Sequence, residues 1–259
     1  KIFLLLNIQM ILNAEEMFRM VNPMDLSGKT ILITGASDGI GKAAAILVSQ
    51  LGARIVMIAR NRDKLQAVLE ELEGEANKWY SYDLKGIEGI EGLVKTIVNE
   101  NGPLDGFVHS AGIASMRPLK MTTYGFLHDM MLINFYSFIE LIRCLSKKGN
   151  FRDGMSIVGM SSVSSIRGFK SKTAYSATKA AMDGAIRSLA KELGEKGIRI
   201  NSIVAGFIRT EMLKKSMEQT GRQENDTMFD KYCLGLGEDR KSTRLNCSQE
   251  SPSRMPSSA

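Results

Sequence analysis

Short apolar runs rich in β-branched residues alternate along the chain with longer segments in which apolar residues recur every three or four positions. The short runs predict buried strands, and the longer segments predict amphipathic helices. Strands are expected at residues 29–34, 54–59, 78–82, 106–109, 155–160 and 199–204. Helices are expected at residues 42–51, 61–73, 87–99, 123–145 and in a segment that carries Tyr175 and ends near Glu192. This alternation predicts an α/β fold with a single, doubly wound parallel sheet and helices on both of its faces.

The length and composition favour one large domain. The chain has 259 residues, 44% of them hydrophobic, which is enough for a full core. Its three cysteines, Cys144, Cys233 and Cys247, lack the spacing of metal ligands. We therefore expect no disulfide framework, no metal site and a reducing compartment, the cytoplasm.

The net charge is +6, but Lys and Arg are spread along the chain and no run of twenty apolar residues occurs. The sequence thus predicts neither a nucleic-acid partner nor a membrane span.

The two ends of the chain differ in pattern from the rest. The globular pattern begins near Met24, and we expect residues 1–23 to be an upstream extension or a mis-set start. Residues 239–259 show no apolar periodicity and resemble a conceptual translation of a sequencing-library adapter. We expect this segment to be a non-native, disordered tail, which leaves residues 24–238 as the folded domain.

A glycine-rich turn joins the first predicted strand to the first predicted helix. It contains Gly35, Ser37, Gly39, Ile40 and Gly41, with the spacing G-x-x-x-G-x-G. Glycines in this context permit a tight turn and a close approach of the backbone to a ligand, and they leave the amides of the helix N-terminus facing a diphosphate. These five residues are therefore candidates for binding a dinucleotide cofactor.

Further cofactor candidates follow the next three strands. Arg60 stands where a carboxylate would bind the adenosine ribose of NAD, and a guanidinium suits a 2′-phosphate, so NADP(H) is favoured over NAD(H). The alternative is a solvent-exposed arginine at the start of the next helix. Asp83 and Leu84 end the third strand, where a carboxylate could meet the adenine amino group. Ala111 and Gly112 follow the fourth strand and would let the backbone pass close to the cofactor.

The candidate catalytic centre lies around residues 161–181. Tyr175 and Lys179 are four apart in a segment rich in alanine, so a helix would place the phenol and the ammonium on one face. An ordinary exposed helix pair is the alternative. Ser162 ends the fifth strand, at the sheet edge where ligands bind in open α/β sheets. Asn134 lies among apolar residues and must find partners, either in a core network or at the active site.

These motifs, in their order and separations, resemble the classical short-chain dehydrogenase/reductase family over residues 26–237, and bacterial 3-oxoacyl-[acyl-carrier-protein] reductases in particular. The resemblance implies a Rossmann-type catalytic domain over residues 24–238. It also implies that Tyr175 is the proton donor and that Lys179 lowers the tyrosine pKa and holds the nicotinamide ribose. Ser162 would orient the substrate oxygen, and Asn134 would position a water that connects Lys179 to solvent. The same family pattern assigns to cofactor binding the residues after the sixth strand, which are Gly206, Ile208 and Thr210.

The chain departs from the family pattern at three places. His109 and Ser110 stand where the family often has two asparagines, and Ala205 stands where it has proline. The stretch 232–237 resembles the lead-in to the family's last helix and strand, which we expect to be lacking. Because that strand helps form the family's tetramer, we expect a homotetramer of the full-length protein and not of this truncated chain.

The leading functional hypothesis is an NADPH-dependent reductase of carbonyl substrates, in particular the 3-oxoacyl thioesters of fatty acid biosynthesis. An NAD(P)-dependent alcohol or steroid-type dehydrogenase is the alternative within the same class. A non-catalytic NADP(H)-binding sensor or scaffold is the alternative of another class, although such a protein has no use for the trio of Ser162, Tyr175 and Lys179.

Overall fold

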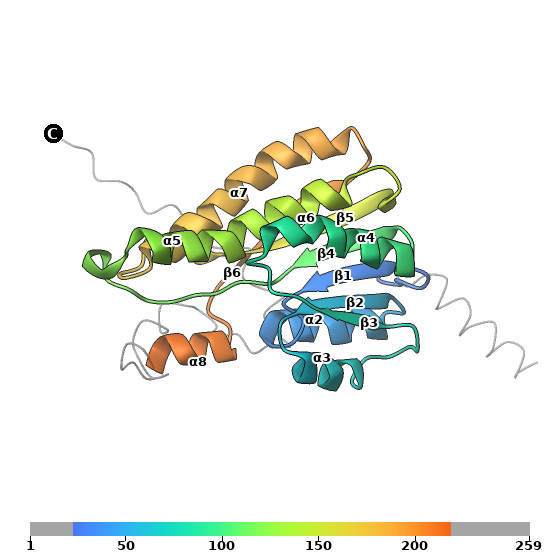
Figure 1. Cartoon of the computed structure of the whole chain (residues 1–259), viewed down its shortest axis with the longest axis horizontal. Helices are drawn as coiled ribbons and strands as arrows, with labels where there is room; N and C mark the ends of the chain where they lie inside the picture. The colour runs from blue at the N-terminus through green and yellow to red at the C-terminus, as the bar shows by residue number, and fades with distance from the viewer. Residues whose placement is uncertain (1–22, 219–259) are drawn as a thin grey trace, which may run out of the picture.

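A six-stranded, all-parallel sheet forms the centre of the protein, in the strand order β3-β2-β1-β4-β5-β6 (Figure 1). The computed structural model describes residues 23–218. The strands are β1 (Thr30–Thr34), β2 (Arg54–Ala59), β3 (Lys78–Ser81), β4 (Leu104–His109), β5 (Phe151–Ser162) and β6 (Arg199–Ala205). The order and direction confirm the expected doubly wound Rossmann-type sheet. The extension, the adapter-like tail and the stretch 232–237, on which the expected loss of the last strand depends, lie outside the described residues.

Helices cover both faces of the sheet, as expected. They are α2 (Gly39–Gln50), α3 (Arg62–Leu69), α4 (Ile90–Asn101), α5 (Tyr124–Met131), α6 (Ser137–Leu145), α7 (Thr173–Gly194) and α8 (Glu211–Glu218). Figure 1 shows α2 and α3 on one side of the sheet and α4, α6 and α7 on the other. None of the helices between residues 23 and 218 is long and apolar enough to cross a membrane.

Alternate residues of each central strand pack into two separate cores. On β1, Leu32 belongs to the core under α4, α6 and α7, whereas Ile33 belongs to the core under α2 and α3. On β2, Ile58 faces the first core and Met57 the second. All four side chains are fully buried. Burial on both faces explains why the strands are continuous apolar runs, as parallel strands between two helix layers are.

The order in which strands are added to the sheet reverses at β1: β2 and β3 follow on one side of it, and β4, β5 and β6 on the other. Thr34 at the end of β1 pairs with Ile58 of β2 on one side and with His109 of β4 on the other. Connections from these strands leave to opposite faces, so a crevice opens beyond their carboxyl ends. The glycine-rich turn after β1 lies at this switch point.

The structure corrects several expected boundaries. The single helix expected at 123–145 is divided by a π-helical turn, Leu132–Tyr136, which separates α5 from α6. The hydroxyl of Ser137, the first residue of α6, donates to the Ile133 carbonyl of this turn at 2.7 Å. β5 begins at Phe151 rather than 155, because Phe151 already pairs with Leu104 of β4, ahead of an irregularity in the register that the apolar pattern does not reveal. The segment after β6, for which no helix was expected, contains α8.

The close approach at the glycine-rich turn yields a stability prediction. Gly35 has φ +69°, and a Cβ there would lie 2.7 Å from the backbone nitrogen of Ala111. We expect Gly35→Ala to lower the free energy of unfolding by about 2 kcal/mol or more, because the strain and the backbone clash add. Urea unfolding without cofactor measures this. Gly92→Ala, in a helix with open space around it, is the control and should be neutral or stabilising by about 0.5–1 kcal/mol. An equal effect of both changes would contradict the prediction.

Candidate active site

The side chains of Ser162, Tyr175 and Lys179 meet where the end of β5 lies against α7. The Ser162 hydroxyl is hydrogen-bonded to the Tyr175 phenol and accepts from the Ser164 amide at 3.1 Å. The Lys179 ammonium donates to the Met160 carbonyl at 2.6 Å. The expected helix therefore does place the phenol and the ammonium beside the serine at the carboxyl end of the fifth strand.

Burial dominates the protonation of this group. It raises the pKa of Tyr175, and the hydrogen bond from Ser162 opposes this only partly. Burial also lowers the pKa of Lys179 to about 8, and the nearby negative charge of Asp183 opposes this shift. The expectation that Lys179 lowers the pKa of Tyr175 stays a prediction, because burial has the largest effect on this phenol in the cofactor-free structure. The Lys179 ammonium bonds to Met160 there and lies 5.9 Å from the centre of the tyrosine ring.

Asn134 is buried in the π-helical turn and has found partners on two sides. Its Oδ1 accepts from the Ile113 amide at 2.8 Å, and its Nδ2 donates to the Ile113 carbonyl at 2.9 Å and to the Thr178 hydroxyl at 3.1 Å. A Cβ on Gly112 would lie 3.2 Å from Asn134 Oδ1 and 3.8 Å from Lys179 Nζ. Asn134 is therefore a satisfied core amide that lies directly behind the site. Its expected role in holding a water stays a prediction.

A cavity of about 560 Å³ occupies the crevice at the switch point. It extends over the ends of β1, β2, β3 and β4, and ten of the expected cofactor residues line it. These are Gly35, Ser37, Gly39, Ile40, Arg60, Asp83, Leu84, Ala111, Gly112 and Thr210. A second cavity of about 120 Å³ is lined by Ser162, Tyr175, Lys179, Gly206 and Ile208, and it shares Ile40, Gly112 and Thr210 with the first. The two cavities therefore adjoin, and the expected catalytic centre lies next to the expected cofactor crevice.

The glycine-rich turn fits a phosphate-binding role. Gly39 begins α2 with φ +51°, and its amide donates to the Asp38 side chain at 2.7 Å. The amide of Ile40, the next residue, has no partner within the helix, and Ile40 lines the cavity. Gly41 does not line the cavity; a Cβ on it would collide with the Gly35 carbonyl. Gly41 thus serves the packing of the turn itself, whereas Gly39 and Ile40 border the crevice.

Four charged residues that line the crevice were not expected from the sequence: Asp38, Lys64, Glu211 and Lys215. Lys64 and Asp38 both line it and form an ion pair of 2.7 Å, which holds the pKa of the Asp38 carboxyl below its usual value. Lys215 of α8 lines the same cavity. Lys64 lies in the first turn of α3, four residues after Arg60, and this spacing could have indicated it. Lys215 lies in a segment without a recognisable pattern.

Lys172 was also missed, although it lies at the catalytic cavity. Its side chain is 9% exposed, and its ammonium lies 5.3 Å from the centre of the Tyr175 ring and 5.9 Å from that of Phe207. Its position in the sequence, three residues before Tyr175 and at the start of the same predicted helix, could have indicated this. Lys172 therefore adds positive charge beside the phenol.

His109 has no catalytic position. It is fully buried at the end of β4, and its Nδ1 lies 3.0 Å from the Thr34 hydroxyl. Burial lowers its pKa to about 3, so the ring is neutral at physiological pH. The residue that replaces a family asparagine here thus ties β4 to β1 below the crevice.

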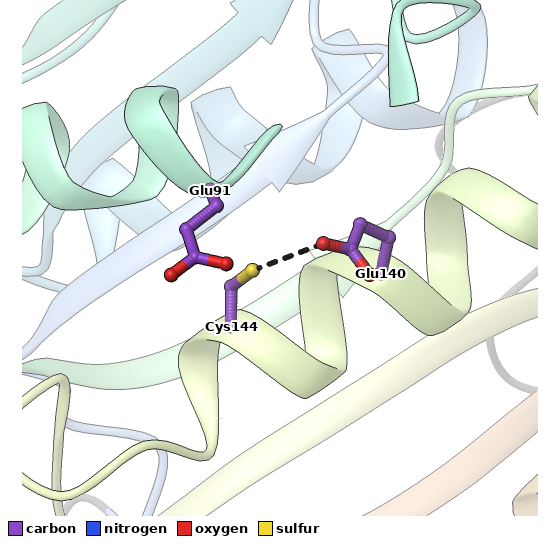
Figure 2. Close-up of side chains that lie close together, drawn as sticks. All are labelled: Glu91, Glu140 and Cys144. Carbon is purple, nitrogen blue, oxygen red and sulfur yellow. Dashed lines mark hydrogen bonds between the residues drawn. The ribbon is translucent and has the colours of Figure 1, made fainter. Parts of the chain in front are cut away.

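A cluster of potential metal ligands lies away from these cavities, on α4 and α6. Figure 2 shows Glu91, Glu140 and Cys144, whose ligand atoms lie within 4.8 Å of one another. Arg143 bonds both carboxylates, at 2.7 Å and 2.6 Å, and Lys147 bonds Glu91 at 2.5 Å. Burial raises the pKa of the Cys144 thiol to about 11, so it stays protonated. The cluster is thus an ion-pair network between two helices and a poor metal site.

Known proteins match most of the described chain. The family model described as short chain dehydrogenase matches residues 29–221. The 3-oxoacyl-[acyl-carrier-protein] reductase FabG of Vibrio harveyi is 32% identical over 191 residues, which are 74% of this chain and 78% of that protein. Carbonyl reductase family member 4 of Danio rerio is 32% identical over 185 residues, 70% of this chain and 76% of that protein.

Solved structures share the fold. A dehydrogenase/reductase from Sinorhizobium meliloti has a TM-score of 0.74 at 30% identity, with 83% of this chain and 85% of that one covered. A short chain dehydrogenase from Shigella flexneri, complexed with NADP, has a TM-score of 0.68 at 32% identity, with 77% of this chain and 85% of that one covered.

The low pKa of buried Lys179 yields a prediction for stability against pH. Between about pH 8 and pH 10.5 the unfolded chain binds a proton at this lysine that the folded protein does not, so the protein becomes more stable as pH rises through this window. We expect the difference in free energy of unfolding between the wild type and Lys179→Met to shift in favour of the wild type by roughly 3 kcal/mol over the whole window. Urea unfolding at several pH values measures it. A difference independent of pH would contradict the buried, shifted lysine.

Proposed function

The chain belongs to the short-chain dehydrogenase family and is an NAD(P)-dependent oxidoreductase, and from this premise we propose that it reduces the carbonyl group of a small-molecule substrate with NADPH. One observation carries the proposal: the Tyr175 phenol, hydrogen-bonded to Ser162, lines a cavity that adjoins the crevice lined by the glycine-rich turn. A proton donor is thus placed at one end of a dinucleotide-sized crevice.

Tyr175 is the proton donor in this proposal. A bound nicotinamide supplies the hydride, and negative charge then develops on the substrate oxygen, which needs a proton and fixed hydrogen bonds. Because burial raises the pKa of Tyr175, the phenol keeps its proton at neutral pH and is ready to donate it. Ser162 holds the phenol in the cofactor-free protein, and in the proposed complex its single O–H turns to the same substrate oxygen.

Lys179 and Asn134 are assigned to positioning the cofactor and a water next to Tyr175. Lys179 uses one N–H bond on the Met160 carbonyl, and we assign its other two to the nicotinamide ribose and to a water held near Asn134. The backbone at Ile113, which Asn134 clamps through two hydrogen bonds, forms part of the crevice wall. Asn134 therefore also fixes the shape of the crevice next to Lys179.

NADPH is the proposed cofactor because the Arg60 guanidinium lines the crevice and forms no ion pair with the other described residues. Lys64 and Lys215 also line the crevice, but Asp38, which pairs with Lys64, and Glu211 balance their charge. A guanidinium pairs well with a phosphate through two parallel hydrogen bonds, so Arg60 is assigned to the 2′-phosphate. The Shigella flexneri relative was solved with NADP, which supports the same choice.

The substrate class proposed is a 3-oxoacyl thioester, on the similarity to the Vibrio harveyi reductase. No contact in residues 23–218 favours a secondary alcohol or a steroid over it. Comparing the turnover of acetoacetyl thioesters with that of secondary alcohols separates these substrates. The cytoplasmic location and the homotetramer of the full-length protein stay predictions.

The proton-donor role predicts a selective loss of turnover. Tyr175→Phe keeps the ring and its packing but removes the hydroxyl, so we expect kcat for ketone reduction to fall by at least about 100-fold while NADPH binding stays within a few-fold. Steady-state kinetics and fluorescence titration of NADPH measure the two effects. Tyr136→Phe, on the π-helical turn, is the matched control and should keep full activity. Unchanged turnover in Tyr175→Phe would refute the mechanism.

The 2′-phosphate assignment predicts a change of cofactor preference. Arg60→Asp removes the cation and places a carboxylate where it can bind a ribose diol, so we expect the ratio of kcat/KM for NADPH over NADH to fall by about 100-fold or more. Arg62→Asp makes the same change of charge at an exposed position outside the cavity and should alter the ratio only slightly. If both variants shift the ratio equally, general charge and not Arg60 sets the preference.

A further inference from the structure

Three consecutive residues at the end of β5 each bond to α7. The Met160 carbonyl accepts from Lys179, and the Ser162 hydroxyl bonds to Tyr175. Between them, the Ser161 hydroxyl donates to Asp183 Oδ2 at 2.8 Å. The first and third contacts involve residues with roles in the proposed reaction. The contact to Asp183 has no role yet.

Asp183 lies on the same face of α7 as the two reactive side chains. Tyr175, Lys179 and Asp183 are spaced by four residues, so each lies about one helical turn from the next. The Oδ1 atom of Asp183 is buried and has no hydrogen-bond partner among the described residues. A carboxylate held out of water with one oxygen unsatisfied costs stability. Stability alone therefore does not account for a carboxylate at this position.

We propose that Asp183 is a positioning residue of the active site, whose negative charge keeps Lys179 a cation and whose bond to Ser161 fixes the end of β5 beneath Tyr175. The inference rests on the proposed function for its effect on turnover, but the interaction of Asp183 with Lys179 stands without it. Asp183 acts through its neighbours and touches neither substrate nor cofactor in this proposal.

Among the described residues around Lys179, Asp183 is the one that supplies negative charge to its ammonium. On α7 the ammonium faces Tyr175, whose raised pKa keeps it neutral, and Lys172 at the start of that helix is itself a cation. From β4 it faces His109, which is neutral because burial lowers its pKa to about 3. From β5 the Met160 carbonyl accepts its hydrogen bond, and Asn134 on the π-helical turn is an uncharged amide. Asp183 is the carboxylate that opposes the effect of burial on Lys179.

Direct titration of Lys179 tests the proposal. The ¹³Cε resonance of Lys179 is followed against pH in the cofactor-free protein, with Lys179→Met for its assignment. Asp183→Asn keeps an acceptor for Ser161 but removes the charge, so we expect the midpoint to fall by about one pH unit. Ser161→Ala removes the hydrogen bond and keeps the charge, so its midpoint should stay within about 0.3 units of the wild type. An unchanged midpoint in Asp183→Asn, or an equal shift in both variants, overturns the proposal.

The wild type provides a second measurement that does not depend on the folding of a variant. The ¹³Cγ resonance of Asp183 should move with a midpoint near pH 8, as Lys179 loses its proton; a resonance that does not move in this range overturns the proposal. In turnover assays with NADPH, the basic limb of the pH profile of kcat/KM should shift with the Lys179 midpoint in Asp183→Asn. Because both titrations need neither cofactor nor substrate, failure of the proposed reductase activity would be distinguishable from failure of this inference.

Discussion

The contact between the last three residues of β5 and one face of α7 is the interaction on which the site depends. It fixes a strand end, which the sheet already holds, against a helix that is stabilised by its packing on the core. The bonds made there, between Met160 and Lys179, between Ser161 and Asp183 and between Ser162 and Tyr175, are formed in a buried environment. Their strength is therefore little reduced by water, and the reactive phenol is held before any ligand arrives.

The same burial that strengthens these bonds sets the protonation of the site. The pKa of Tyr175 rises and the pKa of Lys179 falls, because both charged forms lose water. In the cofactor-free protein Tyr175 is thus a neutral acid next to Lys179, which Asp183 helps to keep charged. At the other end of the crevice the charged side chains are not buried: Arg60 and Lys64 are exposed to solvent, where they can attract a phosphate from solution.

Much of the fold and of the site was predictable from local patterns. Continuous apolar strands and the turn from Gly35 to Gly41 predict a doubly wound sheet, because only burial on both faces and a close backbone approach explain them. The partners of Asn134 were not predictable, since Ile113 and Thr178 lie 21 and 44 residues away in the chain. The spacing of Tyr175 and Lys179 predicts a shared face but not the depth of burial, which decides the direction of both pKa shifts. The π-helical turn interrupts an apolar periodicity that is regular in the sequence.

Hydride transfer from the crevice to a carbonyl group beside Tyr175 is the central claim, and isotope transfer tests it most directly. The protein would be incubated with NADPH deuterated at the nicotinamide C4 and with a panel of ketones and acetoacetyl thioesters, and the products analysed by mass spectrometry and NMR. The account predicts one deuterium per turnover at the new carbinol carbon of the product. NADPH bound in the crevice without transfer of deuterium to any member of the panel would contradict it.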